Sequence, residues 1–463
     1  MANDQCKSVL ILGLAASGEA AARLLLAEGR KVTVLDGKNT PEIRGRAGKI
    51  QKYGAVVFAG ASKIPDGDFE LCVVSPGVRP DSPVLKEIVS RGIPVLPEFE
   101  LGWLRAKCPV IAVTGSNGKS TLVKLCAETM RLVGLKTFAA GNYGPPVSQI
   151  VLDHPALDWL VIEVSSFQLE TARNFHPDIG VLLNVFPNHL DRHHDLRSYT
   201  AAKARLFARM TDKHRAVVNE NNLSEINGML GGKLRLVSFG LSAEADWFFR
   251  ENFVGTRFSD QKVQLENTVF ANEIMGQAAA AAAAVMAACK IPFSCLERAA
   301  RDFKPLPHRL ESVGMLRGVR FVDDSKATNA AALAAALKIT AGKVRLIAGG
   351  LPKNESYAPL KPLLAEKASG VYLIGQAAGE MGTAWGETVA CRICGTLEKA
   401  AAEAWREAVP GETILLSPAC ASFDQFRSFE ERGRRFRQFY DSLAAEQAGR
   451  EAKPAPGAKK QGV

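Results

Sequence analysis

The sequence predicts an α/β protein of three domains. Its 463 residues correspond to about three domains of ordinary size. Two segments, one near the start and one just after residue 109, read as an apolar strand, a glycine-containing turn and a helix, which is how a doubly wound parallel sheet is built. We expect domains over residues 1–97, 98–305 and 306–448, and a disordered, Lys/Pro/Ala/Gly-rich tail over 449–463.

The first domain opens with a predicted strand over Ser8–Leu12, a turn, and a helix over Glu19–Glu28. The next strand ends at Asp36, as in sheets that bind nucleotides. Ala15 stands where a dehydrogenase fingerprint has its second glycine, which disfavours NAD. The segment Ser75-Pro76-Gly77 follows another apolar strand and is either a plain turn or a ligand contact at the strand's carboxyl end.

The central domain begins with the strand Val110–Val113 and the segment Thr114–Thr121, which reads Thr-Gly-Ser-Asn-Gly-Lys-Ser-Thr. A glycine-rich turn between a strand and a helix offers backbone N–H groups to phosphate oxygens. Lys119 is expected at the β- and γ-phosphates of a nucleotide, and the Ser120 hydroxyl at Mg²⁺. Only two residues separate the glycines where the usual loop has four, and a bare Gly-Lys-Ser also occurs by chance.

Two later strand ends carry candidate metal ligands. Glu163 follows the apolar run Leu160–Ile162 and is expected either at Mg²⁺ or as a solvated strand end. His189 and His193 have the spacing of a zinc pair. The H-E-x-x-H pattern is absent, however, and a phosphate loop calls for Mg²⁺. We therefore interpret His189 as a neutral ligand or as a group that polarises phosphate.

Composition narrows the class of protein. The net charge of +10 is spread along the chain without an aromatic-interleaved basic tract, which favours small phosphorylated ligands over nucleic acid. Nine cysteines at irregular spacing indicate reduced thiols, and Cys391 and Cys394 form a lone C-x-x-C without a second pair. The longest apolar stretch, Ala278–Cys289, is too short to span a bilayer and predicts a buried helix. We expect a soluble cytoplasmic protein.

A series of motifs in one order carries a family resemblance. The phosphate loop is followed by Glu163-Val-Ser-Ser-Phe-Gln-Leu-Glu170, Asn184-Val-x-x-Asn-His-Leu-Asp-Arg192 and Leu306-Pro-His-Arg309, then by Asp323-Asp-Ser-Lys-Ala-Thr-Asn329 and Leu416-Ser-Pro-Ala-Cys-Ala-Ser-Phe-Asp-Gln-Phe426. This series resembles the Mur ligases, ATP-dependent amide-forming enzymes of peptidoglycan synthesis, over almost the whole chain. The second and last stretches most resemble the member that adds D-glutamate to UDP-N-acetylmuramoyl-L-alanine.

The resemblance implies a Rossmann-like UDP-binding domain, a central P-loop-type ATPase domain and a C-terminal Rossmann-like domain. It implies ATP, two Mg²⁺ ions and an acyl-phosphate intermediate. We also expect a monomer without a nucleic-acid partner. The UDP-substrate residues implied are Ser17, Asp36, Ser75, Pro76, Gly77 and Asn142. The ATP residues implied are Gly115, Ser116, Asn117, Gly118, Lys119, Ser120, Thr121, Arg309 and Asp324.

The resemblance also assigns catalysis to Lys119, Glu163, His189 and Lys203. The metal ligands implied are Ser120, Glu163, His189 and Lys203, the last as a carbamate; without the family, Lys203 reads as a solvated helix lysine. The D-glutamate pocket implied contains Lys326, Thr328, Lys353, Ser422, Phe423 and Phe429, although both phenylalanines also suit core packing.

One segment departs from the family pattern. The family carries His-Asn before its alanine-rich helix, whereas Ala271–Ala278 contains only Asn272 and Gln277 as possible substitutes in contacting adenine. The residues leave two other functions open. The chain could be another ligase of the superfamily, which adds a different amino acid or adds glutamate to folate, or it could be a nucleotide-dependent regulatory or binding protein with a decayed active site. The last motif and the UDP-type first domain disfavour folate. Retention of Lys119, Glu163, His189 and Lys203 disfavours a decayed site.

Overall fold

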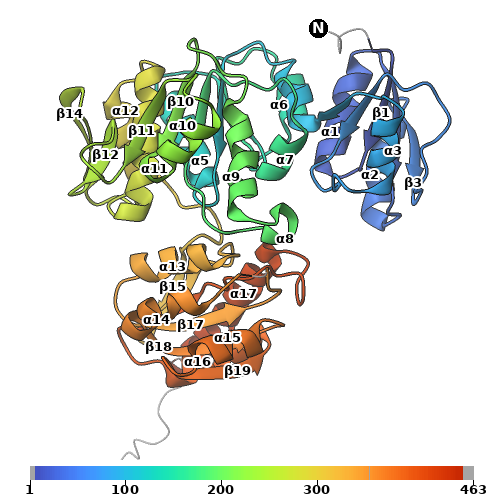
Figure 1. The fold of residues 1–463 in the computed structure, drawn as a ribbon. Helices are drawn as coiled ribbons and strands as arrows, with labels where there is room; N and C mark the ends of the chain where they lie inside the picture. The colour runs from blue at the N-terminus through green and yellow to red at the C-terminus, as the bar shows by residue number, and fades with distance from the viewer. Residues whose placement is uncertain (1–5, 354, 452–463) are drawn as a thin grey trace, which may run out of the picture. The chain divides into compact units, whose positions relative to one another are not determined.

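Three sheets organise the chain (Figure 1). The computed structural model describes residues 6–353 and 355–451. The sheets contain five, nine and six strands, and each is formed by its own stretch of sequence. The predicted three-domain α/β architecture is thereby confirmed. The chain divides into two compact units, Met1–Val185 with Arg197–Phe303, and Phe186–Leu196 with Lys304–Val463.

The first sheet is parallel throughout and has the order β3-β2-β1-β4-β5. Its central strand β1 (Ser8–Leu12) is almost fully buried, as expected for a strand covered on both faces. The chain order reverses on the two sides of β1, so the carboxyl ends of β1 and β4 form the crevice in which such sheets bind ligands. The other elements of this domain are β2 (Lys31–Asp36), β3 (Val56–Ala59), β4 (Leu71–Val74), β5 (Val95–Pro97), α1 (Ala16–Ala27), α2 (Pro41–Gln51) and α3 (Pro83–Ser90).

The central sheet has the order β14-β13-β12-β11-β10-β9-β6-β8-β7. Strands β12 to β14 pair antiparallel and the others pair parallel. The strands are β6 (Val110–Thr114), β7 (Thr137–Gly141), β8 (Trp159–Glu163), β9 (Ile179–Leu182), β10 (Arg215–Asn219), β11 (Leu236–Gly240), β12 (Trp247–Arg250), β13 (Phe253–Thr256) and β14 (Ser259–Gln264). The helices are α4 (Glu98–Trp103), α5 (Lys119–Leu132), α6 (Val147–Asp153), α7 (Ser166–Thr171), α9 (Leu196–Ala204), α10 (Glu220–Met229), α11 (Glu273–Ala288) and α12 (Phe293–Asp302).

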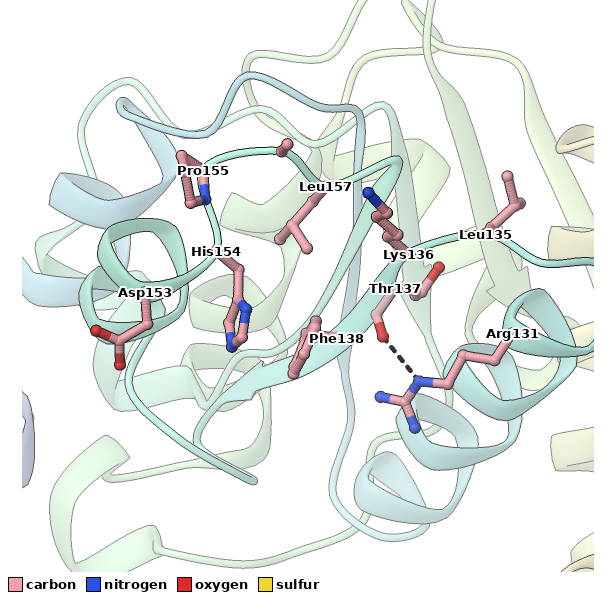
Figure 2. Close-up of a pocket in the computed structure, with 10 residues that line it drawn as sticks. Arg131, Leu135, Lys136, Thr137, Phe138, Asp153, His154, Pro155 and Leu157 are labelled. Carbon is pink, nitrogen blue, oxygen red and sulfur yellow. Dashed lines mark hydrogen bonds between the residues drawn. The ribbon is translucent and has the colours of Figure 1, made fainter.

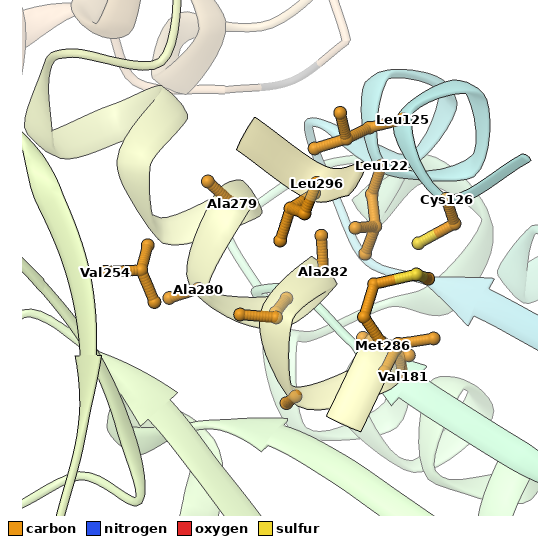
Figure 3. Close-up of a cluster of buried hydrophobic side chains, with 14 of the residues drawn as sticks. Leu122, Leu125, Cys126, Val181, Val254, Ala279, Ala280, Ala282, Met286 and Leu296 are labelled. Carbon is orange, nitrogen blue, oxygen red and sulfur yellow. The ribbon is translucent and has the colours of Figure 1, made fainter. Parts of the chain in front are cut away.

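The alanine-rich helix α11 is the centre of the main hydrophobic cluster, as Figure 3 shows. The side chains of Ala279 to Ala283 have no exposed surface. Because alanine side chains are short, α11 packs closely against α5, α12 and strands of the sheet. The predicted buried helix over Ala278–Cys289 is confirmed, although it begins five residues earlier, where Asn272 caps it by accepting a hydrogen bond from the Met275 N–H group at 3.0 Å.

The third sheet has the order β15-β16-β20-β17-β18-β19, parallel except for the antiparallel pair β15–β16. Its strands are β15 (Glu311–Leu316), β16 (Val319–Asp323), β17 (Val344–Gly349), β18 (Ala368–Ile374), β19 (Cys391–Gly395) and β20 (Thr413–Leu416). Its helices are α13 (Ala330–Ile339), α14 (Lys361–Lys367), α15 (Ala378–Trp385), α16 (Leu397–Glu407) and α17 (Phe429–Glu451), and the same unit includes α8 (Leu190–His193).

The end of the chain differs from the prediction in one respect. Helix α17 continues to Glu451, so the first three residues of the predicted tail are helical, because the helix does not stop where the composition changes. The rest of that segment, 452–463, lies outside the described residues. Within the described part, no helix is both long enough and apolar enough to cross a membrane.

Candidate functional site

The predicted phosphate loop lies at the carboxyl end of the central sheet. It connects β6 to α5, and Gly115 and Gly118 both have positive φ, 150° and 82°. A Cβ atom on Gly115 would lie 3.0 Å from Leu183 Cβ and 3.3 Å from the Asn184 nitrogen. Glycine is therefore required here both by the backbone angle and by the close approach of the next loop.

Asn184 holds this loop in place, a role that the sequence analysis missed. Its Oδ1 accepts hydrogen bonds from the backbone N–H groups of Ser116 at 3.1 Å and Asn117 at 2.9 Å. Its Nδ2 donates to the Asn117 carbonyl at 3.1 Å. The side chain of Lys119 folds over the same loop and donates to the carbonyls of Gly115 at 2.8 Å and Ser116 at 3.0 Å.

The buried carboxylate of Glu163 meets two predicted site residues. Glu163 ends β8, next to β6, and its side chain is 2% exposed. The Ser120 hydroxyl donates to Oε2 at 2.6 Å, and the Asn142 amide donates to Oε1 at 2.6 Å. Asn142 thus lies at the candidate metal site as well as in the loop assigned to the UDP-substrate. Ser120 and Glu163 bring hard oxygen donors together beside the phosphate loop, which is the donor set that Mg²⁺ prefers.

Lys203 is not a solvated helix lysine. It is 1% exposed, its Nζ donates to the Gly115 carbonyl at 2.9 Å, and it lies 4.2 Å from the centre of the Tyr199 ring. Burial and the neighbouring charge of Lys119 hold the pKa of Lys203 well below its ordinary range, and Glu163 opposes this shift. The amine is therefore prone to be neutral, the state in which nitrogen can act as a nucleophile.

Three predicted residues of the first domain, Ser17, Asp36 and Ser75, make hydrogen bonds around the turn that follows β1. The Ser17 hydroxyl donates to the Ser75 hydroxyl at 3.3 Å, which donates to the Gly13 carbonyl at 2.9 Å. Asp36 accepts from the backbone N–H groups of Leu14 at 2.6 Å and Lys38 at 2.8 Å. These contacts shape the turn after β1, at the end of the sheet where doubly wound sheets bind their ligands, and Pro76 and Gly77 directly follow Ser75 in the chain.

In the third domain, Asp324 follows β16 and is buried. It accepts from the Ser417 hydroxyl at 2.8 Å and from the Leu310 N–H group at 3.2 Å. Burial raises the pKa of Asp324 to about 7, although these hydrogen bonds and the charge of Arg309 favour the ionised form. The segments that carry Arg309 and Asp324 are thus held together inside this unit.

Four of the residues assigned to D-glutamate contact one another in pairs, and a fifth, Phe423, exposes its ring. The ammonium group of Lys353 donates to Thr328 at 3.2 Å, and that of Lys326 lies 3.7 Å from the centre of the Phe429 ring. Phe423 is 70% exposed, which contradicts the alternative that it packs in the core. Ser422, directly before it, is 2% exposed.

Arg432 holds the loops around the predicted D-glutamate residues, a role that the sequence analysis did not predict. It is fully buried on α17, and its guanidinium donates to the Ser325 carbonyl at 2.8 Å and to the Cys420 carbonyl at 3.1 Å. These two carbonyls precede Lys326 and Ser422 in the chain. A single side chain therefore fixes the two loops that carry the predicted amino-acid pocket. An arginine inside a long polar helix gives no signal of this role in the sequence.

The predicted metal-ligand role of His189 and the predicted adenine contacts of Asn272 and Gln277 concern two different compact units. His189 lies in the second compact unit, and its role as a ligand stays a prediction. Among the described residues, one group of three or more His, Cys, Asp or Glu has metal-like spacing, namely His308, Glu311 and Asp323, and it includes neither His189 nor His193. The zinc alternative at these two histidines stays untested. Asn272 caps α11, and Gln277 accepts from Asn219 at 2.9 Å; a contact of either with adenine stays a prediction.

A pocket of about 410 Å³ lies at the opposite end of the central sheet (Figure 2). It is lined by the end of α5, the start of β7 and the segment after α6. Phe138 and His154 stack there with ring centroids 4.1 Å apart, and Arg131 donates to the Thr137 carbonyl at 2.8 Å. Since β7 begins here and ends at the phosphate-loop edge, this pocket does not belong to the site described above.

Comparisons with known proteins cover all three domains. A model described as the Mur ligase MurD-like N-terminal domain matches residues 7–97. The Mur ligase middle domain matches residues 113–289, and the Mur ligase glutamate ligase domain matches 308–420. A UDP-N-acetylmuramoylalanine--D-glutamate ligase of Koribacter versatilis is 37% identical over 95% of this chain and 98% of its own length. The enzyme of the same name from Acidobacterium capsulatum is 35% identical, over 93% and 95%.

Solved structures of similar fold are more distant in sequence. The MurF ligase of Thermotoga maritima in complex with ADP has a TM-score of 0.62 at 16% identity, covering 90% of this chain and 96% of that one. The UDP-N-acetylmuramate-alanine ligase MurC of the same organism has a TM-score of 0.58 at 17% identity, over 95% and 100%. At these identities the likeness concerns the fold.

Proposed function

Because the chain belongs to the Mur ligase family, we propose that it joins D-glutamate to UDP-N-acetylmuramoyl-L-alanine with conversion of ATP to ADP and phosphate. The observation that carries this proposal is the alignment, over nearly the full length of both chains, with relatives that bear the name of this ligase. The packing of Ser120, Asn142 and Glu163 beside an intact phosphate loop supports it.

The reaction has two balanced steps. An oxygen of the alanyl carboxylate attacks the γ-phosphorus of ATP, the bond to the ADP oxygen breaks, and an acyl phosphate forms. The amine nitrogen of D-glutamate then attacks the acyl carbon, phosphate leaves with the electrons of its C–O bond, and the proton lost by the nitrogen passes to the departing phosphate. The chain contributes positioning and charge compensation, which dominate phosphoryl transfer.

Lys119 and the loop N–H groups suit the ATP phosphates. In this proposal Lys119 exchanges its contacts with the Gly115 and Ser116 carbonyls for phosphate oxygens. Mg²⁺ would be held by Ser120 and Glu163 and would supply positive charge where the phosphate oxygens become more negative. On the family resemblance, we also propose His189 as a metal ligand. As a metal ligand, His189 does not serve as the proton acceptor.

Lys203 is proposed to act as a carbamate. The neutral amine attacks CO₂, a C–N bond forms, and the nitrogen releases one proton to water, so that a buried amine becomes a negatively charged, carboxylate-like group. Burial supports the first step, because it lowers the pKa of Lys203 and so favours the neutral amine. A second anion beside Glu163 would complete a site for two Mg²⁺ ions, whereas an ammonium group would be repelled by them.

The third domain is proposed to receive D-glutamate. Lys326 and Lys353 are suited to the two carboxylates of this substrate, and the Arg432 side chain fixes the loops before Lys326 and Ser422. On the family resemblance, Arg309 and Asp324 are proposed to bind ATP. We propose that the enzyme acts in the cytoplasm, where ATP and nucleotide-linked precursors are available. We also propose that it is a monomer.

Phosphate release tests the proposal directly. The purified chain is incubated with ATP, Mg²⁺ and UDP-N-acetylmuramoyl-L-alanine, together with D-glutamate, L-glutamate, L-lysine, meso-diaminopimelate or L-alanine. We expect release with D-glutamate alone. Release with another amino acid would keep the ligase chemistry and reject the acceptor. Binding of ATP without release in any mixture would favour a nucleotide-binding regulatory protein and reject the proposal.

A further inference from the structure

A buried carboxylate marks the junction between the first sheet and the central domain. Glu98 directly follows β5 and is the first residue of α4, and it is 2% exposed. Burying an ionisable group is costly unless it is hydrogen-bonded. None of the proposed chemistry uses Glu98, so its partners indicate what it does.

Those partners lie at the start of α6. Glu98 Oε1 accepts a hydrogen bond from the Ser148 N–H group at 2.7 Å, and the Ser148 hydroxyl donates to the Glu98 carbonyl at 3.3 Å. Pro146, which precedes α6, makes no side-chain cap, so Glu98 supplies an acceptor to the first turn from another helix. A Cβ atom on Gly102 would lie 2.6 Å from the Ser148 nitrogen, so the two helices are in direct backbone contact.

The start of α6 is joined to the candidate metal site by a short, stiff loop. Residues 142–146 connect β7 to α6 and end in Pro145 and Pro146, whose φ angles are fixed by their rings. The Gly141 N–H group donates to the Pro145 carbonyl at 2.9 Å, which closes the loop on itself.

Asn142 then contacts Glu163 through both its backbone and its side chain. The Asn142 N–H group donates to the Glu163 carbonyl at 2.9 Å, and the side-chain amide donates to Oε1 at 2.6 Å. A Cβ atom on Gly141 would lie 2.4 Å from the Glu163 carbonyl oxygen. With so little space, a shift of the loop moves the donor that orients the Glu163 carboxylate.

We propose that Glu98 is a positioning residue for the metal-binding carboxylate. Through Ser148 and the loop 142–146 it holds Asn142 against Glu163, and it ties this arrangement to the end of the first sheet. Residues that orient a metal ligand typically change metal affinity or activity by about 10- to 100-fold when they are removed. Glu98 acts one step further away, so we expect an effect of about 3- to 10-fold.

The same helix contains a matched control. Glu100 is also fully buried, and it accepts from the N–H groups of Arg173 at 2.8 Å and Asn174 at 2.6 Å. It ties α4 to the segment after α7 and not to the Asn142 loop. Glu98→Ala and Glu100→Ala therefore remove the same kind of interaction from the same helix, but only the first loosens the support of Asn142.

The test measures metal affinity without turnover. Binding of Mn²⁺ in the presence of ADP is followed by electron paramagnetic resonance for the wild type and for both variants, and melting temperatures are recorded in parallel. We expect both variants to melt earlier, and only Glu98→Ala to weaken Mn²⁺ binding, by about 3- to 10-fold. Glu98→Asp, which keeps an acceptor but shortens the reach, should give a smaller loss and serves if Glu98→Ala does not fold.

A second, kinetic experiment rests on the proposed function. Glu98→Ala should raise the Mg²⁺ concentration for half-maximal phosphate release and lower kcat, with little change in KM for UDP-N-acetylmuramoyl-L-alanine. Equal Mn²⁺ affinities for the wild type and Glu98→Ala, or equal losses for Glu98→Ala and Glu100→Ala, would overturn the inference. A wild type that binds Mn²⁺ and ADP but releases no phosphate would reject the proposed function alone.

Discussion

Replacing Glu98 with glutamine should change how the stability of this protein depends on pH. Burial raises the pKa of Glu98 from an ordinary 4.5 to about 7, although the hydrogen bonds from Ser148 favour the ionised form. Between these two values the folded chain keeps a proton that the unfolded chain releases. The folded state then binds more protons, so the free energy of unfolding falls as pH rises through this window.

The magnitude follows from the two pKa values. At about 1.4 kcal/mol for each tenfold change in proton affinity, the full difference corresponds to roughly 3 kcal/mol. A small part of this is already lost at about pH 5, and relaxation around the ionised group reduces the rest, so we expect about 1 to 2 kcal/mol between about pH 5 and about pH 8. Glutamine does not titrate, and its own packing cost is the same at every pH.

Urea unfolding at a series of pH values measures this difference. Tryptophan fluorescence and far-UV circular dichroism are followed for both proteins, and the unfolding free energy of the wild type is subtracted from that of Glu98→Gln. We expect this difference to shift in favour of the variant as pH rises. Asp324 titrates in the same window, but it is present in both proteins and cancels. A difference that stays constant within about 0.5 kcal/mol from about pH 5 to about pH 8 would refute the reasoning.

Three further outcomes test the site and the core. Lys119→Ala should lower kcat for phosphate release at least about 100-fold in a protein that still folds, because it removes a phosphate contact from the loop; near-normal turnover would remove the phosphate-loop assignment. Lys203→Ala should lower turnover as strongly as Glu163→Ala if the carbamate is a metal ligand, and wild-type kinetics would contradict that role. Ala280→Leu should destabilise the protein by about 1 to 3 kcal/mol in urea unfolding, because it adds three carbons to a fully buried side chain in this cluster (Figure 3); unchanged stability would show that this cluster is loosely packed.

Local patterns predicted the phosphate loop and the strand ends well. Thr114–Thr121 lies between a strand and a helix as expected, and Glu163 ends β8. Such features depend on residues that are neighbours in sequence, so spacing and residue type are enough to find them. Lys203 shows the limit of this approach, since a lone lysine on a helix carries no sign of whether its ammonium group is solvated or buried.

The interactions that organise the site depend on the tertiary structure. Asn184 contacts the phosphate loop from 67 residues away, Glu98 reaches Ser148 across 50, and Arg432 reaches Ser325 across 107. Each is a hydrogen bond to a backbone group, which every residue possesses, so no partner residue type in the sequence marks it.

The sequence by itself therefore determined the domain order, the family and the position of the candidate phosphate loop between a strand and a helix. Only the folded chain decided that the Lys203 amine is buried beside Gly115 and that Asn142 donates to the Glu163 carboxylate. The reason is physical: a motif records which chemical groups are present, whereas burial and contact distance arise when strands β6, β7 and β8 bring their carboxyl ends to one edge of the sheet.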